Sequence, residues 1–336
     1  MNEVISTFAN GKIYIAGEYA VLFNNPAIIF PVDKKIIVNI SFSNKNMIFS
    51  HKYHSKFIDL DLKSSNPDVL YINKTLNWFN EFLESKNMIL NNYNIEIISE
   101  LDNENNSKFG YGSSAAILVA LLKGLLTINK IDYDYLMLYK MAVLIQYSIS
   151  KNTSFGDIAC SVYNEKIIYQ KSQIDLDILL KKQINEQLTL NWPNLVIKPI
   201  KLDLKFLIVN TKVEAKSYDL VSQVTKYKNE EFFSHFIYRS NKLVMELFNN
   251  FNLSSIKYLH DNLLYLSEQT GVNIFTNEMI KINEVIYLYN GVIKSSGAGG
   301  GDNVLCFFNN DMKLLEAKNK LDIMGYSTII YGGIYE

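Results

Sequence analysis

Hydrophobic and polar residues alternate along several short segments of the chain, as they do in half-buried β-strands. In the first part of the chain this alternation predicts strands at residues 4–9, 12–16, 36–42 and 93–98. Apolar residues spaced three and four positions apart predict amphipathic helices at residues 67–83 and 134–148. Because strands and helices mix here without a regular alternation, the pattern favours an α+β fold over a doubly wound parallel sheet.

The pattern changes near residue 200. Two strands, at residues 195–200 and 205–209, precede a series of helices. These helices are expected at residues 218–228, 231–248, 254–269 and 276–289. A chain of 336 residues can bury a large core and is long enough for two domains. We therefore expect an N-terminal domain of residues 1–200 and a C-terminal domain of residues 201–336.

A glycine-rich loop lies between the predicted strand at 93–98 and a long apolar segment that begins after Ala116. Gly110 and Gly112 allow a positive φ and a close approach of the backbone, and the free amide groups of a following helix would point into the loop. A phosphate group is the natural ligand of such a site. The loop is not a Walker loop because no lysine follows its last glycine. Many glycine-serine loops before helices bind nothing, so a plain structural turn is the alternative.

Two serines follow these glycines. Ser113 is placed to cap the helix, and Ser114 has a hydroxyl that could ligate a magnesium ion held by the phosphates. A second glycine run, at residues 297–301, has four glycines in five positions between predicted strands at 291–294 and 304–308. It requires several positive φ angles or a close backbone approach, unless it is a surface hairpin.

Two charged residues occupy positions where packing does not require them. Lys12 lies inside an apolar predicted strand, where burial is costly unless a carboxylate such as Glu18 or a more distant one pairs with it. An edge position for this lysine is the alternative. Asp157 precedes an apolar segment, and helix capping is the alternative to a chemical role.

Composition excludes several classes of function. The 33 basic and 34 acidic residues nearly cancel, which argues against a nucleic-acid partner. The only arginine is Arg239, so a polyphosphate would be held by lysines, a metal and backbone amides.

Cys160 and Cys306 lie in apolar runs and are expected as buried thiols. His51 and His54 would point to opposite faces of a strand and share no metal. With neither a signal peptide nor a membrane span in the sequence, we expect a cytoplasmic protein with no membrane partner.

Together these segments resemble the motifs of the GHMP kinases, the small-metabolite kinases that include galactokinase, homoserine kinase, mevalonate kinase and phosphomevalonate kinase. The first motif is matched by residues 11–21, the second by 109–116 and the third by 295–302. The resemblance implies a two-domain α+β fold, with an N-terminal half like domain 2 of ribosomal protein S5 and a ferredoxin-like C-terminal half. It also implies ATP as cosubstrate, Mg²⁺ as cofactor and a cleft for both substrates.

Within that family, residues 11–22 are most similar to the opening of the bacterial phosphomevalonate kinases, whereas mevalonate kinases usually have His where Tyr19 stands. Three positions depart from the pattern: Tyr111 replaces Leu, the customary Pro before the loop is missing, and Asn303 stands where Cys is common. The resemblance implies transfer of the γ-phosphoryl group of ATP to (R)-5-phosphomevalonate, in the mevalonate pathway of isoprenoid biosynthesis. Two alternatives stay open: mevalonate as the acceptor, and an ATP-binding sensor of the same family without turnover.

The chemistry of that reaction suggests roles for the charged residues. A phosphate acceptor is already largely ionised at neutral pH, so a general base is not required. Catalysis must then consist of positioning and charge neutralisation. We expect Lys12 to bridge the donor and acceptor phosphates. Asp157 matches the family's catalytic aspartate and is expected to orient Lys12 or the metal.

The resemblance also implies the binding residues. ATP is expected at the glycine loop, at Gly110, Gly112, Ser113, Ser114 and Ala115, with Ser114 also on the metal. The acceptor is expected against Lys108, Ser154, Ser217, Ala298, Gly299 and Gly300. The partners are therefore small molecules, and the protein is expected to be a monomer or a homodimer.

Overall fold

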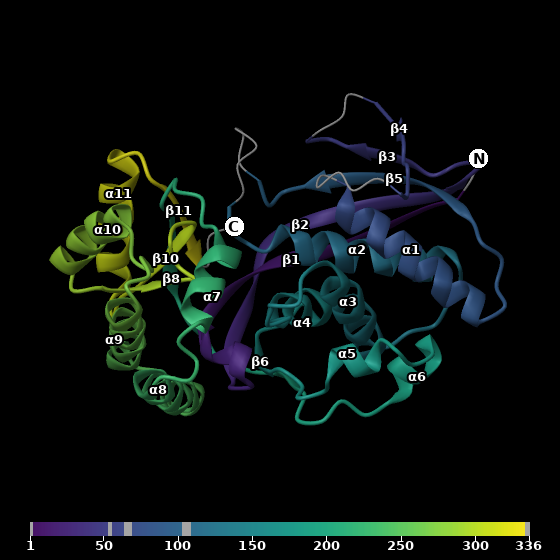
Figure 1. The fold of residues 1–336 in the computed structure, drawn as a ribbon. Helices are drawn as coiled ribbons and strands as arrows, with labels where there is room; N and C mark the ends of the chain where they lie inside the picture. Colours follow the sequence, from purple (N-terminus) through teal and green to yellow (C-terminus); the bar gives the residue numbers. More distant parts are fainter. Residues whose placement is uncertain (1–2, 53–55, 64–68, 103–108, 333–336) are drawn as a thin grey trace.

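The structure is a computed structural model that describes residues 3–52, 56–63, 69–102 and 109–332. Its first sheet has the strand order β4-β3-β5-β2-β6-β7, with β1 paired to β2. These strands are β1 (Val4–Ala16), β2 (Ala27–Ser43), β3 (Met47–Ser50), β4 (Ile58–Asp59), β5 (Asn92–Ser99), β6 (Ile167–Gln170) and β7 (Val196–Pro199). Figure 1 shows the long antiparallel pair β1 and β2 reaching from the N-terminal elements toward the C-terminal ones.

The second sheet has the order β11-β8-β10-β9 and is antiparallel throughout. Its strands are β8 (Phe206–Asn210), β9 (Val292–Ser295), β10 (Asn303–Phe307) and β11 (Ser327–Tyr331). The helices that accompany it are α7 (Ser217–Thr225), α8 (Glu231–Asn249), α9 (Leu253–Thr270), α10 (Asn277–Leu288) and α11 (Asp311–Ile323). In Figure 1 these green and yellow elements form one half of the molecule.

The helices of the other half gather around α2 (Ser113–Ile128). Helix α2 is apolar on nearly all sides because it packs against β1 and β2 and against α1, α3 and α4. The remaining helical segments are η1 (Ala20–Phe23), α1 (Leu70–Ser85), α3 (Tyr135–Ile149), α4 (Gly156–Tyr163), α5 (Leu176–Leu179) and α6 (Ile184–Thr189). Since α2 runs along β1, its first residues lie beside the part of β1 that contains Lys12.

Most predicted elements are confirmed, with shifted ends. The strands predicted at 4–9 and 12–16 are one strand, β1, whose register with β2 is irregular between Asn10 and Lys12. The helix predicted at 67–83 is α1, which begins at Leu70, while Pro67 and Asp68 lie outside the described residues. The four helices predicted after residue 200 are α7 to α10. The pattern did not predict α11 or β11, but the α+β class is confirmed.

One hydrophobic core runs through both halves. Its largest cluster joins α2 and the first sheet to Phe206 of β8, Leu247 of α8 and Phe307 of β10. The predicted domain change at residue 200 falls between β7 and β8, which belong to different sheets. Because the packing is continuous across that point, the division at residue 200 stays a prediction.

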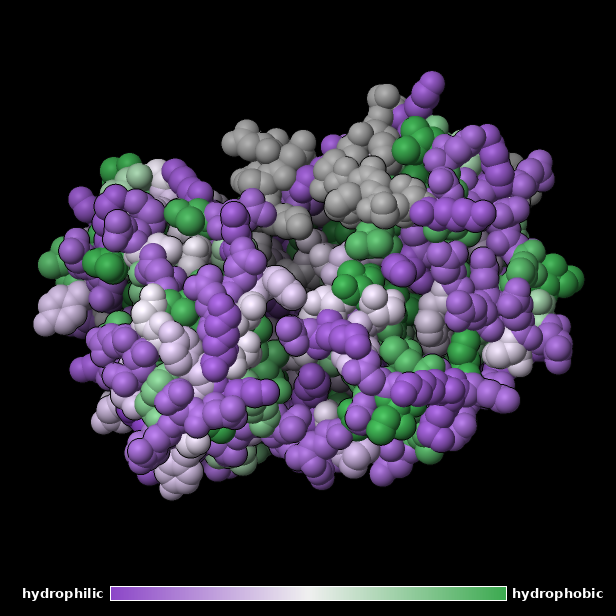
Figure 2. Space-filling view, in the orientation of Figure 1, coloured by the Kyte–Doolittle hydropathy of each residue, from purple (hydrophilic) through white to green (hydrophobic). Residues whose placement is uncertain are grey.

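The face of the molecule seen in Figure 2 is mainly polar. Figure 2 shows hydrophilic residues over most of one face, with hydrophobic residues in small separate groups. No helix in the described part of the chain is both long enough and apolar enough to cross a membrane.

Candidate active site

A cleft of about 540 Å³ lies where the two halves meet. Its walls come from β1, η1, α1 to α4, α7 and the loop between β9 and β10. The predicted site residues on these walls are Lys12, Gly110, Gly112, Ser113, Ser114, Ser154, Asp157, Ser217 and Ala298. A second cavity, of about 560 Å³, lies between Phe23 and α8 and contains none of them. The central cleft is therefore the candidate active site.

Three of the predicted residues that the structure describes do not line this cleft. Ala115 is buried in the core beneath the loop. A Cβ atom on Gly299 would lie 2.5 Å from the Ile274 carbonyl oxygen, and one on Gly300 would lie 2.5 Å from Leu220, so both glycines pack against neighbouring protein. Lys108 lies outside the described residues.

The glycine loop has the backbone geometry that its sequence requires. Gly110 and Gly112 have φ angles of 76° and 77°, which an L side chain rarely adopts. Gly112 is the N-cap of α2, and no side chain caps the helix. The prediction that Ser113 caps α2 is wrong because Ser113 is already the first helical residue. The first amide groups of α2 consequently have no side-chain acceptor and can bind an anion.

Lys12 lies directly over this loop. Its backbone amide donates to the Tyr111 carbonyl at 2.8 Å, and a Cβ atom on Gly112 would lie 2.9 Å from Lys12 Cε. Pairing with Glu18 is wrong: among the described residues Lys12 takes part in no ion pair, because Glu18 is bonded to Lys294. A half-buried ammonium without a counter-ion, beside free helix amides, favours a phosphate ligand.

Asp157 lies in the first turn of α4, on the same cleft wall. It is not a helix cap, since the N-cap position belongs to Phe155. Nearby, the Tyr14 hydroxyl and Ser154 Oγ are 2.8 Å apart. Burial, and secondly the Asp157 carboxylate, raise the pKa of Tyr14 well above its usual value. Tyr14 therefore stays a neutral hydrogen-bonding group beside Lys12.

The loop between β9 and β10 is held by residues that follow β1. The Tyr19 hydroxyl donates to the Ala298 carbonyl at 2.6 Å. The Glu18 carboxylate accepts from Lys294 and from the Gly297 backbone. Burial raises the pKa of Glu18 and lowers that of Lys294, while their mutual attraction opposes both shifts. The four glycines between residues 297 and 301 all have positive φ, as predicted.

Sequence reasoning missed several cleft residues, including Tyr14, Tyr71, Gln146, Thr153 and Asp302. Gln146 Nε2 donates to the Tyr71 hydroxyl at 3.2 Å, which joins α3 to α1 within the cleft. The Thr153 hydroxyl is buried and has no partner among the described residues. The tyrosines and Gln146 sit at regular positions of apolar segments, so the sequence could not distinguish them from core residues.

The two thiols agree with expectation, whereas the expectation for the histidine pair is not tested. Cys160 and Cys306 are buried and free, and burial raises the pKa of both. Among the described residues no group of three or more His, Cys, Asp or Glu side chains could hold a metal. His51 contacts Glu96 at 2.8 Å, and His54 lies outside the described residues.

Residues 71–165 match the family model "GHMP kinases N terminal domain". This segment contains the glycine loop, α2 and Asp157. This part of the chain is therefore similar to the N-terminal domain of the GHMP kinases. The two-domain GHMP kinase fold expected from the motifs is confirmed by the structural similarity below.

Similar proteins of known activity align with nearly the whole length of this chain. Phosphomevalonate kinase of Streptomyces sp. (strain CL190) is 24% identical over 332 residues, which are 89% of this chain and 88% of the relative. Phosphomevalonate kinase of Saccharolobus solfataricus is 26% identical over 331 residues, 95% of each chain. The structure of Streptococcus pneumoniae phosphomevalonate kinase in complex with phosphomevalonate and AMPPNP has a TM-score of 0.86 and 26% identity, over 97% of this chain and 100% of that one.

Proposed function

We propose that this protein is a GHMP kinase that transfers the γ-phosphoryl group of ATP to (R)-5-phosphomevalonate, giving (R)-5-diphosphomevalonate and ADP in the mevalonate pathway. The observation that carries the proposal is the position of Lys12, whose uncompensated ammonium lies over the glycine loop at the junction of the two halves. Relatives named for this activity align over most of the chain, which supports the same acceptor.

The reaction brings two anions together. An ionised phosphomonoester must approach the γ-phosphate of ATP, so the cleft has to neutralise charge on both sides of the bond that forms. We propose that Lys12 lies between the two phosphates and lowers their repulsion. The free amides of the α2 N-terminus then hold the phosphates of ATP with Gly110, Gly112, Ser113 and Ser114, and Ala115 supports the loop from below.

Magnesium fits this site through few protein ligands. The Ser114 hydroxyl lines the cleft at the start of α2, and the described residues offer no three-ligand cluster that would form a separate metal cage. Mg²⁺ characteristically keeps waters and substrate phosphates as ligands, so one hydroxyl suits it. Bound there, the ion would neutralise charge on the ATP phosphates.

The acceptor is proposed to contact Ser154, Ser217 and the Ala298 region, which line the cleft from the loop before α4, from the start of α7 and from the β9–β10 loop. Lys108 remains a proposed ligand for its phosphate. Gly299 and Gly300 contribute through the backbone shape of the loop, because both pack closely against Ile274 and Leu220.

An assay of ADP release tests the proposal, with mevalonate and phosphomevalonate supplied in parallel. We expect MgATP-dependent turnover with phosphomevalonate and little with mevalonate. Turnover with mevalonate alone would show a hydroxyl acceptor and make Asp157 a general base. Nucleotide binding without turnover of either acceptor would favour a sensor.

A further inference from the structure

The C-terminal sheet contacts the phosphate-binding loop through one buried side chain. Asn303 is the first residue of β10, and only 1% of it is exposed. Its Nδ2 group donates a hydrogen bond to the carbonyl oxygen of Phe109. That carbonyl immediately precedes Gly110, whose positive φ begins the turn into α2. The contact joins residues 194 positions apart in the sequence.

The other end of the Asn303 amide is also bonded. Its Oδ1 accepts from Asn210 Nδ2 at 3.4 Å, and Asn210 is its partner in the β8–β10 register. A carbonyl oxygen can only accept, so the contact with Phe109 requires Nδ2 to face the loop. Both polar ends therefore orient the amide, and the bonds compensate for the cost of burying it.

The preceding residue reinforces the contact. The Asp302 amide donates to the Val213 carbonyl at 2.7 Å, and its carbonyl accepts from the Thr211 amide at 2.8 Å. A Cβ atom on Gly110 would lie 2.5 Å from Asp302 Cγ, so the aspartate packs on the loop where only glycine leaves room. Asp302 and Asn303 thus brace the glycine loop against the segment that leads into α7.

We infer that Asn303 is a positioning residue of the nucleotide site: its amide holds the Phe109 carbonyl in place, so that the glycine loop and the start of α2 face the phosphates. The C-terminal half thereby completes a site whose ligating groups all belong to the N-terminal half. Asn303 itself does not line the cleft. The inference rests on the proposed binding of ATP at this loop but not on the identity of the acceptor.

This role has a specific kinetic consequence. Without the Asn303 donor the Phe109 carbonyl loses its partner, and the loop must be ordered by the nucleotide itself. We expect the affinity for nucleotide to fall about tenfold, as for loss of one hydrogen bond to a partly buried group. The KM for the acceptor should change less than twofold, because the Asn303 side chain bonds to Phe109 and Asn210 and to none of the described acceptor contacts.

Asn303→Leu is the informative variant, since it keeps the branching of the side chain at Cγ and removes the donor. Asn262→Leu is its matched control. Asn262 is 2% exposed, and its Nδ2 donates to the Phe236 carbonyl at 3.2 Å, between α9 and α8 and outside the cleft lining. The probe is AMPPNP with Mg²⁺, titrated by calorimetry into each purified full-length protein. Urea unfolding measures the stability of each protein in parallel.

We expect Asn303→Leu to bind AMPPNP about tenfold more weakly than the unsubstituted protein, and Asn262→Leu to bind within twofold of it at a similar loss of stability. If Asn303→Leu bound AMPPNP as tightly as the unsubstituted protein, the inference would be overturned. Equal losses of AMPPNP affinity in Asn303→Leu and Asn262→Leu would also overturn it. Should Asn303→Leu not fold, Asn303→Ala replaces it. Failure of both to fold, with Asn262→Leu folded, would make Asn303 structural and also overturn the inference. Absence of turnover with phosphomevalonate would instead count against the proposed function alone.

Discussion

At the scale of single residues, charge is the property that matters most in the cleft. Lys12 and Asp157 line the same cavity, and both act electrostatically on the thiol of Cys160. They form no ion pair with each other within the described structure. Each charge therefore remains available to a ligand, but only the lysine can compensate a phosphate directly.

The two charges should differ in their importance. Lys12→Met is expected to lower kcat by about two to three orders of magnitude, as loss of a preorganised charge partner does. Asp157→Asn is expected to lower kcat only about tenfold. An ionised phosphate acceptor needs no base, and the carboxylate only orients its neighbours. Steady-state kinetics with saturating MgATP and phosphomevalonate measure both values.

Lys198→Met provides the control, because Lys198 is exposed on β7 and does not line the cleft. Its kcat should equal that of the unsubstituted protein. Comparable losses for Lys12→Met and Asp157→Asn, with the acidic limb of the pH profile absent only in the aspartate variant, would identify Asp157 as a general base instead.

At the scale of elements, the turn after β1 and the strand β9 are joined by a buried ion pair. Glu18 and Lys294 are almost entirely buried, and Lys294 also donates to the Ser295 carbonyl at 2.6 Å. Desolvation raises the pKa of Glu18 and lowers that of Lys294, while the attraction between the two charges opposes both shifts. The pair holds the β9–β10 loop against the cleft through Gly297.

Breaking this pair should destabilise the protein strongly. Lys294→Met leaves an uncompensated buried carboxylate and is expected to lower the free energy of unfolding by about 3–5 kcal/mol. The double variant Glu18→Leu/Lys294→Met should lose less free energy of unfolding than the two single variants lose together, because no buried charge remains. Urea unfolding measures all three.

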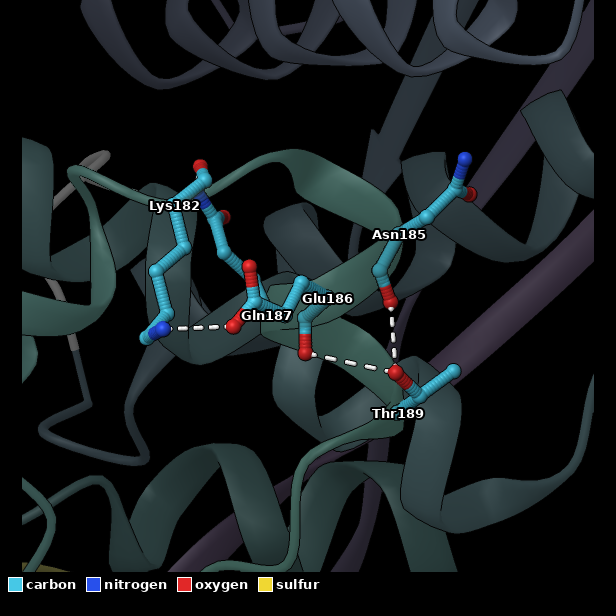
Figure 3. Close-up of polar contacts among 5 residues, drawn as sticks. All are labelled: Lys182, Asn185, Glu186, Gln187 and Thr189. Atoms are coloured by element: carbon cyan, nitrogen blue, oxygen red, sulfur yellow. Dashed lines mark hydrogen bonds and ion pairs between the residues drawn. The ribbon is translucent and has the colours of Figure 1, made fainter.

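An exposed pair of similar geometry is the control. Lys182 Nζ lies 2.5 Å from Glu186 Oε1 at the start of α6, where Figure 3 shows the two side chains side by side. Both are well exposed, so Lys182→Met should change the free energy of unfolding by less than about 1 kcal/mol. A Lys294→Met variant no less stable than Lys182→Met would contradict the assigned role of the buried pair.

At the scale of the whole molecule, the two halves share one core. Phe206, Leu247 and Phe307 from the C-terminal half belong to the same cluster as α2 and the first sheet. Two smaller clusters lie within the C-terminal elements and around η1 and α8. Because this core crosses the predicted domain boundary at residue 200, it couples the folding of the two halves.

We therefore expect one unfolding transition rather than two. Both tryptophans, Trp78 and Trp192, lie in the N-terminal half, so their fluorescence reports on that half while circular dichroism reports on the whole chain. The two signals should have the same midpoint in urea. Phe307→Ala, in the shared core, should lower the free energy of unfolding by about 3–5 kcal/mol. Both midpoints should therefore fall together. Separate midpoints, or a shift in only one signal, would show that the halves unfold independently.

Much of the candidate site could be predicted residue by residue. Lys12, Ser114 and Asp157 stand out because charged or polar groups occupy positions without a packing reason, and the structure places all three on one cleft. Gly299 and Gly300 were predicted to face the acceptor but pack against Ile274 and Leu220. The glycine run predicts positive φ angles, and these two glycines have them. It does not predict the direction in which the loop turns.

The sequence by itself determined the local properties of this protein: which segments alternate as strands or repeat as helices, where only glycine permits the backbone, and where charges lie in apolar surroundings. Tertiary structure alone decided the partners. Glu18 pairs with Lys294, 276 residues away, and Phe109 with Asn303, 194 residues away. The physical reason is that φ preference and hydrophobic period are properties of neighbouring residues, whereas a partner depends on which distant strands and helices pack together and in what register.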